Sequence, residues 1–253
     1  MLYLYIINTI KTKNRLNNMN IEEFLNNATK CWHFAIDIAW DQNQRNNDIS
    51  RGTCLKDRSF FRSLLGTDQI SVFMQAVELA DKVATKEDMD VLLPQILEHM
   101  KTKFPPSLAS NEYEEGMSVR YATLANNYCY LHFRNAKYPE SFLKYPAYFA
   151  QNIKYIMDKA QKEHNCNTLY TATWLNSLPK FLKFFPQEWH DNLTDTIPYG
   201  PTMGWQGQFI NGAGLLNEAT AKKFLETGVL PYARRESHCS FEEMRKHLTK
   251  LGF

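Results

Sequence analysis

The chain has 253 residues, of which 44% are hydrophobic and 22% are charged, and its formal net charge is +2. That length is at the upper edge of what a single hydrophobic core supports, so one domain is expected. A charge of +2 is too small for the clustered lysines and arginines that neutralise duplex phosphates, so we expect no nucleic-acid partner. Residues 1–116 carry −3 and residues 117–253 carry +5, which is compatible with a small anionic ligand in the C-terminal half.

The cysteines favour a reducing compartment. They are odd in number and show no C-x-x-C spacing, so neither a disulfide framework nor a zinc ribbon fits. The first ten residues are apolar, but lysines follow them rather than precede them, which reverses the order of a signal peptide. This stretch is also too short to span a membrane. We therefore expect a cytoplasmic protein with no membrane partner.

The first predicted helix begins after Asn20, a good N-cap residue, and continues to about Gln44 with apolar residues three and four apart. Because Met19 stands just before this helix, we predict that residues 1–18 are an extension outside the fold and that residues 19–253 form a single α-helical domain. His33, Asp37 and Asp41 share one polar face of the helix at the spacing of metal ligands. We interpret them as a solvated face and predict no metal, since no second helix carries matching ligands.

The middle of the chain predicts further helices. Residues 70–83 keep the helical period, and Thr85 with Asp88 forms a capping-box pattern before a helix that Pro94 either kinks or divides. Residues 117–135 are interpreted as a helix with Asn126 and Asn127 at its middle, and residues 146–162 as another. Residues 168–174 are rich in β-branched and aromatic types, but without an obvious partner strand they are interpreted as extended or helical chain within an α protein.

Near the C-terminus, Asn217 and Gly228 predict the start and end of one helix, and Ser240 with Glu243 predicts the capping box of the last. The predicted fold class is accordingly mainly α: a single-domain multi-helix bundle with a C-terminal loop region rich in glycine and aromatic residues.

Residues 199–214 are the most unusual stretch, because they hold five of the ten glycines of the chain. Such a cluster indicates a shaped loop, either binding a ligand or folded over a core. The aromatic stretch 174–189 would form the floor beneath it, and two arginines before the last helix could hold an anionic group. The predicted ligand-binding residues are Trp174, Tyr199, Trp205, Gln206, Gln208, Asn211, Arg234 and Arg235.

No phosphate loop, nucleophile elbow, zinc-protease motif or paired C-x-x-C occurs, so the sequence predicts no cofactor and no named reaction. Two function classes stay open. The chain is either a small-molecule binder, with or without enzymatic activity, or an interaction protein whose aromatic C-terminal surface receives a protein partner. An enclosed pocket would favour the first class, and a flat aromatic surface the second.

Overall fold

The structure is a computed structural model that describes residues 20–59, 61, 65, 70–104, 114–137, 139–197, 207–210 and 215–253. These residues fall into two compact units. Unit 1 contains the described residues between 114 and 197 and residues 232–253, and unit 2 contains those between 20 and 104 and between 207 and 231. The single domain stays a prediction, because two units can still unfold in one cooperative transition. Residues 1–18 lie outside the described part of the chain.

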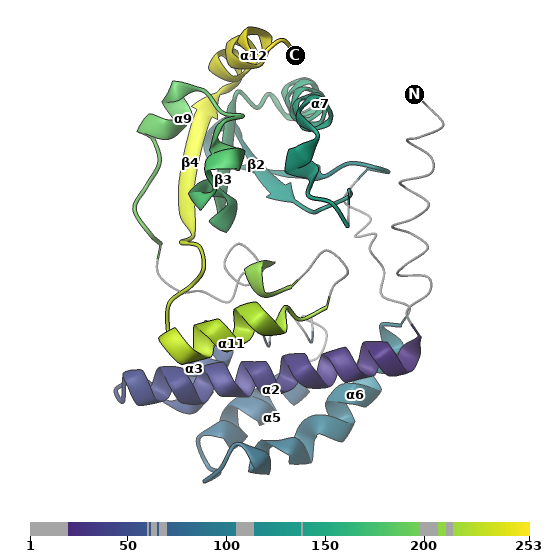
Figure 1. Ribbon diagram of the computed structural model, residues 1–253, viewed down its shortest axis with the longest axis vertical. Coiled ribbons are helices and arrows are strands. Elements are labelled where there is room, and N and C mark those ends of the chain that lie inside the picture. The colour runs from purple at the N-terminus through teal and green to yellow at the C-terminus, as the bar shows by residue number, and fades with distance from the viewer. Residues whose placement is uncertain are drawn as a thin grey trace. The chain divides into compact units, whose positions relative to one another are not determined.

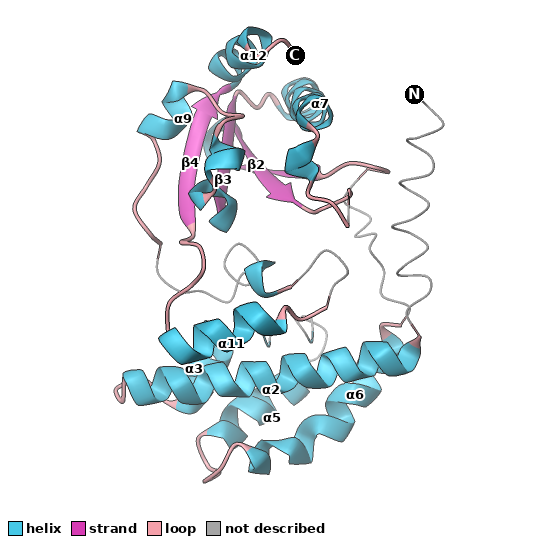
Figure 2. Cartoon of the chain, in the orientation of Figure 1, coloured by secondary structure: helices cyan, strands magenta, loops and turns pink. Residues whose placement is uncertain are grey.

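Unit 1 is built on a four-stranded mixed sheet, drawn as arrows in Figure 2. The strands are β1 (Val119–Leu124), β2 (Tyr128–Phe133), β3 (Thr168–Thr173) and β4 (Arg235–Ser240), in that spatial order. The outer pairs, β1–β2 and β3–β4, are antiparallel, and the central pair β2–β3 is parallel. Parallel neighbours need a long crossover, and α7 (Pro146–His164) supplies it.

The sheet shows that the predicted mainly α helical bundle is wrong and that the fold is mixed α/β. Residues 117–135, predicted as one helix, form the hairpin β1–β2. Asn126 and Asn127, placed at the middle of that helix, have φ of 64° and 62° in the turn between the strands. Asparagine adopts this left-handed conformation more readily than most residues, because its short polar side chain bonds locally. The asparagine pair therefore marks a turn rather than a helix interior.

The strand-like segment 168–174 is the second correction. Thr168–Thr173 forms β3, a central strand, paired with β2 on one side and β4 on the other. Its second partner was hidden because β4 reads Arg-Glu-Ser-His-Cys-Ser, which is polar and lacks the β-branched residues typical of strands. Only the small side chains of Ser237 and Cys239 are buried in β4, so hydrophobic patterning did not mark it.

Four helices of unit 1 lie against one face of the sheet. Besides α7 they are α8 (Pro179–Leu182), α9 (Gln187–Asp191) and α12 (Phe241–Lys250), and Figure 1 shows α7, α9 and α12 around the strands. Short 3-10 turns, Phe142–Lys144 and Trp174–Ser177, precede α7 and follow β3. The core beneath the helices includes Leu131, Phe149, Leu169, Phe181, Trp189 and Met244.

Unit 2 is helical. Its elements are α2 (Ile21–Arg45), α3 (Arg51–Arg58), α5 (Ile70–Ala80), η2 (Glu87–Leu92), α6 (Leu93–Thr102), η6 (Gly207–Phe209) and α11 (Glu218–Thr227). Several predicted ends are confirmed. The Asn20 side chain accepts a hydrogen bond from the Glu23 N–H at 2.7 Å, and Asn217 caps α11 in the same way through Thr220. Pro94 divides its predicted helix into η2 and α6.

The close approach of α3 to α5 depends on Gly52. A Cβ atom at this position would lie 2.4 Å from the carbonyl oxygen of Val77 and 2.6 Å from the Asp81 carboxylate. The same carboxylate accepts hydrogen bonds from the Gly52 N–H at 2.7 Å and the Ser50 hydroxyl at 3.0 Å, at the start of α3. A side chain here would have to displace backbone. Glycine thus lets Asp81 bind the helix terminus directly.

Among the described residues, no helix combines the length and the apolar character needed to cross a membrane.

Candidate functional site

The sheet of unit 1 carries a group of aromatic side chains on the face opposite its core. Alternate residues of a strand point to opposite faces. In β2 the buried residues are Cys129 and Leu131, so Tyr128 and Tyr130 point the other way, and in β3 the same alternation places Tyr170 with them. We define the tyrosine face as the side chains of Tyr128, Tyr130, His132, Tyr170, Glu236 and His238. All six are only partly buried.

Strand register brings these rings together. Tyr130 is opposite Tyr170, and Tyr170 is opposite His238, so one row crosses three strands. The ring centroids of Tyr130 and Tyr170 are 5.3 Å apart, and those of Tyr128 and Tyr170 are 6.0 Å apart with the planes 25° from parallel. These separations are those of interacting aromatic pairs. The three tyrosines do not belong to the hydrophobic core beneath the helices.

Charged groups border the face along β4. Burial raises the pKa of Tyr170 to about 12, and the negative charge of Glu236 and its hydrogen bond with the phenol act in the same direction. The positive charge of Arg234 acts in the opposite direction, which places its guanidinium within electrostatic reach of the ring. Tyr170 therefore keeps its proton under ordinary conditions and can donate it in a hydrogen bond to Glu236.

Arg234 is the predicted binding residue that the structure brings to this face. Its Nε atom is buried and has no hydrogen-bond partner among the described residues. A guanidinium N–H without a partner is costly in a buried position, because it has lost water and gained nothing in return. Because the Nε atom is shielded from solvent, a ligand oxygen on this face would have to be held by the other nitrogens of the guanidinium. On β1, Arg120 is opposite His132 and borders the face at the other edge of the sheet.

The other predicted site residues of unit 1 have structural contacts. Arg235 belongs to the opposite face and donates from Nε to the carbonyl oxygen of Thr194 at 2.7 Å. Trp174 stacks on Tyr232 with centroids 5.5 Å apart and planes 23° from parallel. These contacts account for both side chains without a ligand.

Only a small part of the glycine-rich stretch is described. Gln208 lies in η6 of unit 2, where it is 8% exposed and next to the fully buried Phe209. The other predicted residues of the stretch, Tyr199, Trp205, Gln206 and Asn211, lie outside the described residues. The predicted binding role of residues 199–214 stays a prediction.

Unit 2 has a groove of its own, between α2 and α11, with a volume of about 480 Å³. Its apolar floor includes Phe34, Leu216, Ala221 and Leu225. Six charged or titratable side chains line its rim: Lys30, His33, Asp37, Glu218, Lys222 and Glu226. The groove is the second surface of the described chain that we consider as a site.

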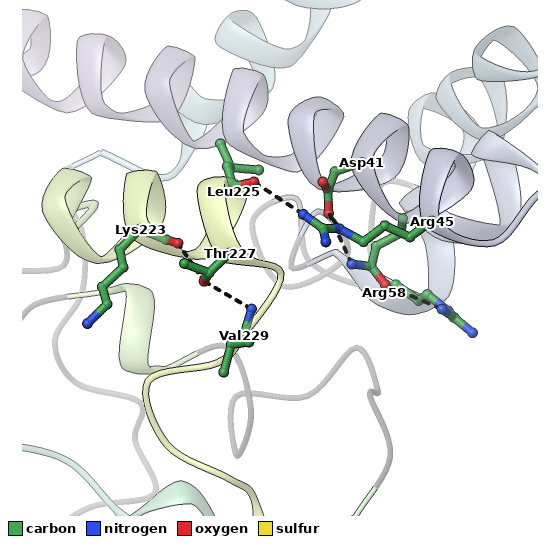
Figure 3. A network of polar contacts seen from close by, with 8 residues as sticks. Asp41, Arg45, Arg58, Lys223, Leu225, Thr227 and Val229 are labelled. Carbon is green, nitrogen blue, oxygen red and sulfur yellow. Dashed lines mark hydrogen bonds and ion pairs between the residues drawn. The ribbon is translucent and has the colours of Figure 1, made fainter.

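Polar contacts fix α11 against α2 at the end of this groove (Figure 3). Arg45 of α2 donates from Nε to Asp41 at 2.7 Å and from a terminal nitrogen to the carbonyl oxygen of Leu225 at 3.4 Å. That carbonyl is in the last turn of α11, where a cation is favoured. Beyond it, Gly228 has φ of 67°, and a Cβ there would lie 2.6 Å from the guanidinium carbon. Glycine makes this close contact possible.

Every charged residue of the groove rim already has a partner in unit 2. Lys30 contacts Glu218 at 2.6 Å, and Lys222 contacts Glu226 at 3.8 Å. His33 contacts Asp90 at 3.0 Å, and Asp37 contacts Lys86 at 2.6 Å. The predicted solvated face of α2 thus carries side chains that are hydrogen-bonded or ion-paired to neighbours. No group of three or more potential ligands in the described residues could hold a metal. The groove therefore presents little unsatisfied charge to a ligand.

Comparisons with protein-family models, with characterised proteins and with solved structures find no match for this chain. The functional argument therefore depends on the two surfaces described above.

The cysteines offer no reactive group to either surface. All five thiols, at positions 31, 54, 129, 166 and 239, are free and buried. Burial raises the pKa of the Cys31 thiol to about 12 and raises the pKa of Cys129 and Cys239 as well. Since the thiolate is the nucleophile, these cysteines are inert in the native protein.

Sequence reasoning missed the three tyrosines and Glu236. A signal was present, because Tyr-Cys-Tyr-Leu-His-Phe alternates large polar rings with apolar residues over six positions. That is the period of a strand with one exposed face. The signal was overlooked because residues 117–135 were predicted as one helix.

Proposed function

We propose that unit 1 binds single-stranded nucleic acid across the tyrosine face, with bases stacked on the tyrosine rings and phosphates held by Arg120 and Arg234. The observation that carries the proposal is the row of rings from β2 and β3, with centroids 5.3–6.0 Å apart on a partly exposed sheet face. Aromatic side chains on such surfaces stack unpaired bases, and each base contributes about 1–3 kcal/mol.

A flat surface favours this ligand over an enclosed small molecule. A sheet face displays its rings side by side, so it accommodates an extended chain of planar groups, whereas small ligands prefer concave sites. The proposal belongs to neither of the two classes left open by the sequence, and it departs from the expectation of no nucleic-acid partner that the small net charge suggested. Stacking on aromatic rings requires fewer cationic groups than duplex binding does.

The small net charge limits the proposal to single strands. Two arginines border the face, far fewer than the six to ten phosphate contacts of a typical duplex-binding protein. Stacking supplies most of the affinity in this proposal, and it requires bases that are not paired. With two phosphates neutralised, the logarithm of the binding constant should fall by about 1.4 per tenfold rise in salt.

Fluorescence anisotropy with a labelled twelve-nucleotide oligouridine tests the proposal. Tyr170→Leu keeps an apolar side chain in β3 but removes the ring, so binding should weaken about tenfold as stacking is lost. The matched control is Tyr155→Leu, which removes a tyrosine of α7 that is 41% exposed and should leave binding unchanged. Equal affinities for wild type and Tyr170→Leu, or no binding by the wild type, would refute the proposal.

A further inference from the structure

The two edge strands of the sheet in unit 1 differ in how their outer backbone groups are used. The outer edge of β4 is covered by residues 192–197. The N–H of Thr194 donates to the carbonyl oxygen of Glu236 at 3.0 Å, and its hydroxyl accepts from the Glu236 N–H at 2.9 Å. The N–H of Ile197 donates to the carbonyl oxygen of Arg234 at 2.8 Å. These contacts leave no place for a further strand beside β4.

The other edge strand, β1, has no such partner segment among the described residues. The Arg134 N–H donates to the Ser118 carbonyl oxygen at 2.9 Å, and along an antiparallel hairpin every second pair of opposite residues is hydrogen-bonded. Tyr121 and Thr123 belong to the pairs in between, so their N–H and C=O groups point away from β2. Within the described chain, no hydrogen bond reaches these outer groups.

β1 also lacks the features that normally keep an edge strand from pairing with another chain, which are lysines, prolines, bulges and inward-pointing charges. Its sequence, Val-Arg-Tyr-Ala-Thr-Leu, contains neither proline nor lysine, and its register with β2 continues without a bulge. Its one charged residue is Arg120, and Leu124 at its other end is 44% exposed. This edge is therefore suited to receive a further strand.

We propose that the further strand is β1 of a second copy of this chain, paired antiparallel and centred on Ala122. With this centre, Tyr121 of one copy lies opposite Thr123 of the other, so the outward N–H and C=O groups of the two residues bond to each other. An aromatic ring opposite a β-branched side chain is also a favourable cross-strand pair. A two-fold axis at Ala122 forms this pair twice.

The same centre suits the two ends of the strand. Leu124 of one copy lies opposite Arg120 of the other, whose aliphatic stem can cover the exposed leucine. The two arginines are kept apart, so no like charges lie opposite each other. A strand that complements itself in this way favours a second copy over a foreign peptide.

Pairing at β1 would join the two four-stranded sheets without a break. Residues that lie opposite each other in an antiparallel pair share one face of the sheet, so both tyrosine faces would lie on the same side of the joined sheet. The self-association does not depend on the proposed function. Its consequence, that a long single strand can contact both tyrosine faces, does rest on that function.

Sedimentation velocity of the full chain at rising protein concentration tests the proposal, and the wild type should convert from monomer to dimer. Thr123→Lys introduces the residue by which natural edge strands avoid pairing, and the two-fold axis brings both new charges near each other. Dimerisation should therefore weaken several-fold. The matched control is Thr249→Lys on α12, which adds the same charge at an exposed position far along the chain and should leave dimerisation unchanged.

Introduced cysteines test the register, because the five native cysteines are buried. Ala122→Cys should give a disulfide-linked dimer on mild oxidation, since the axis places residue 122 of the two copies opposite each other in a pair without backbone hydrogen bonds, where side chains come closest. Leu124→Cys is the control, because position 124 lies opposite position 120 rather than itself. It should stay monomeric on a denaturing gel without reductant.

A wild type that stays monomeric at every concentration would overturn the inference and leave the proposed function standing. The inference would equally fail if Thr123→Lys dimerised as tightly as the wild type, or if Leu124→Cys crosslinked as readily as Ala122→Cys. A dimer with the expected crosslink that binds no oligouridine would support the inference and refute the proposed function.

Discussion

The tyrosine face of unit 1 and the α2–α11 groove of unit 2 differ in how far the protein satisfies its own side chains. In the groove, Lys30 and Lys222 contact carboxylates of α11, and the other charged rim residues are paired within unit 2. On the tyrosine face, Arg234 has a buried Nε with no partner in the described chain. The groove is hollow, yet its polar groups already have partners. The comparison indicates that, in this protein, polar groups without hydrogen-bond partners identify a binding surface better than a concave shape does.

The largest expected effect comes from removing two stacking rings at once. Tyr128→Leu combined with Tyr130→Leu should weaken oligouridine binding about a hundredfold, because each lost stack contributes about 1–3 kcal/mol. The groove variant Lys222→Ala should leave the affinity unchanged, since this side chain is 78% exposed and contacts a carboxylate of its own helix. Anisotropy titrations of both variants check the contrast. A stronger effect of Lys222→Ala than of the double variant would reverse the assignment of the two surfaces.

A smaller effect is expected from the polar contacts that hold α11. Arg45→Ala removes the hydrogen bonds to Asp41 and to the Leu225 carbonyl, so the free energy of unfolding should fall by about 1–1.5 kcal/mol. Lys82→Ala is the control, because it removes an ion pair with Glu78 in which Lys82 is 70% exposed, and such pairs contribute little. Urea unfolding measures both. Oligouridine binding should be the same in both variants. A loss of oligouridine binding in Arg45→Ala would indicate that the groove takes part in function.

The helices of unit 2 were predicted well because the patterns that specify them involve residues close together in the sequence. The N-cap contacts of Asn20 and Asn217 depend on residues three positions away, and helical periodicity depends on neighbours along the chain. The same holds for the predicted capping box of α12 in unit 1, where the Ser240 hydroxyl accepts a hydrogen bond from the Glu243 N–H at 3.2 Å. Arg45 and Gly228 meet only in the folded chain, and no sequence pattern announces a contact between positions 180 residues or more apart.

The strands of unit 1 were mispredicted because strand pairing depends on residues far apart in the sequence. Tyr130, Tyr170 and His238 become neighbours through two strand pairings, which join residues 40 and 68 positions apart in the sequence. Of the predicted site residues, Arg234 borders the resulting face, whereas Arg235, one position later, points to the other face. The alternation of a strand decides between them, and β4 was not recognised as a strand. If Asn126 and Asn127 are interpreted as a turn, the alternating residues of β2 that follow them can be recognised as a strand with its tyrosines on one face.

The smallest expected effect concerns pH and the buried thiol of Cys31 in unit 2. Burial raises the pKa of Cys31 to about 12, above the value of 9.0 for an unperturbed thiol. The folded state therefore binds the Cys31 proton more tightly than the unfolded state does. The resulting contribution to the free energy of unfolding is intact below pH 9 and is lost as the pH rises toward 12. Between pH 8 and pH 10 the free energy of unfolding should fall by about 1 kcal/mol from this group. Urea unfolding of wild type and Cys31→Ala at both pH values measures it, and an equal fall in both proteins would contradict the assignment.

Photocrosslinking tests the central claim most directly. A twelve-nucleotide oligouridine that contains 4-thiouridine is bound to the full chain, irradiated and digested, and the crosslinked residues are located by mass spectrometry. The account predicts adducts at Tyr128, Tyr130 and Tyr170, and their loss when unlabelled oligouridine competes. Adducts confined to residues of α2 and α11, or adducts that persist under competition, would contradict the claim that the tyrosine face is the binding surface.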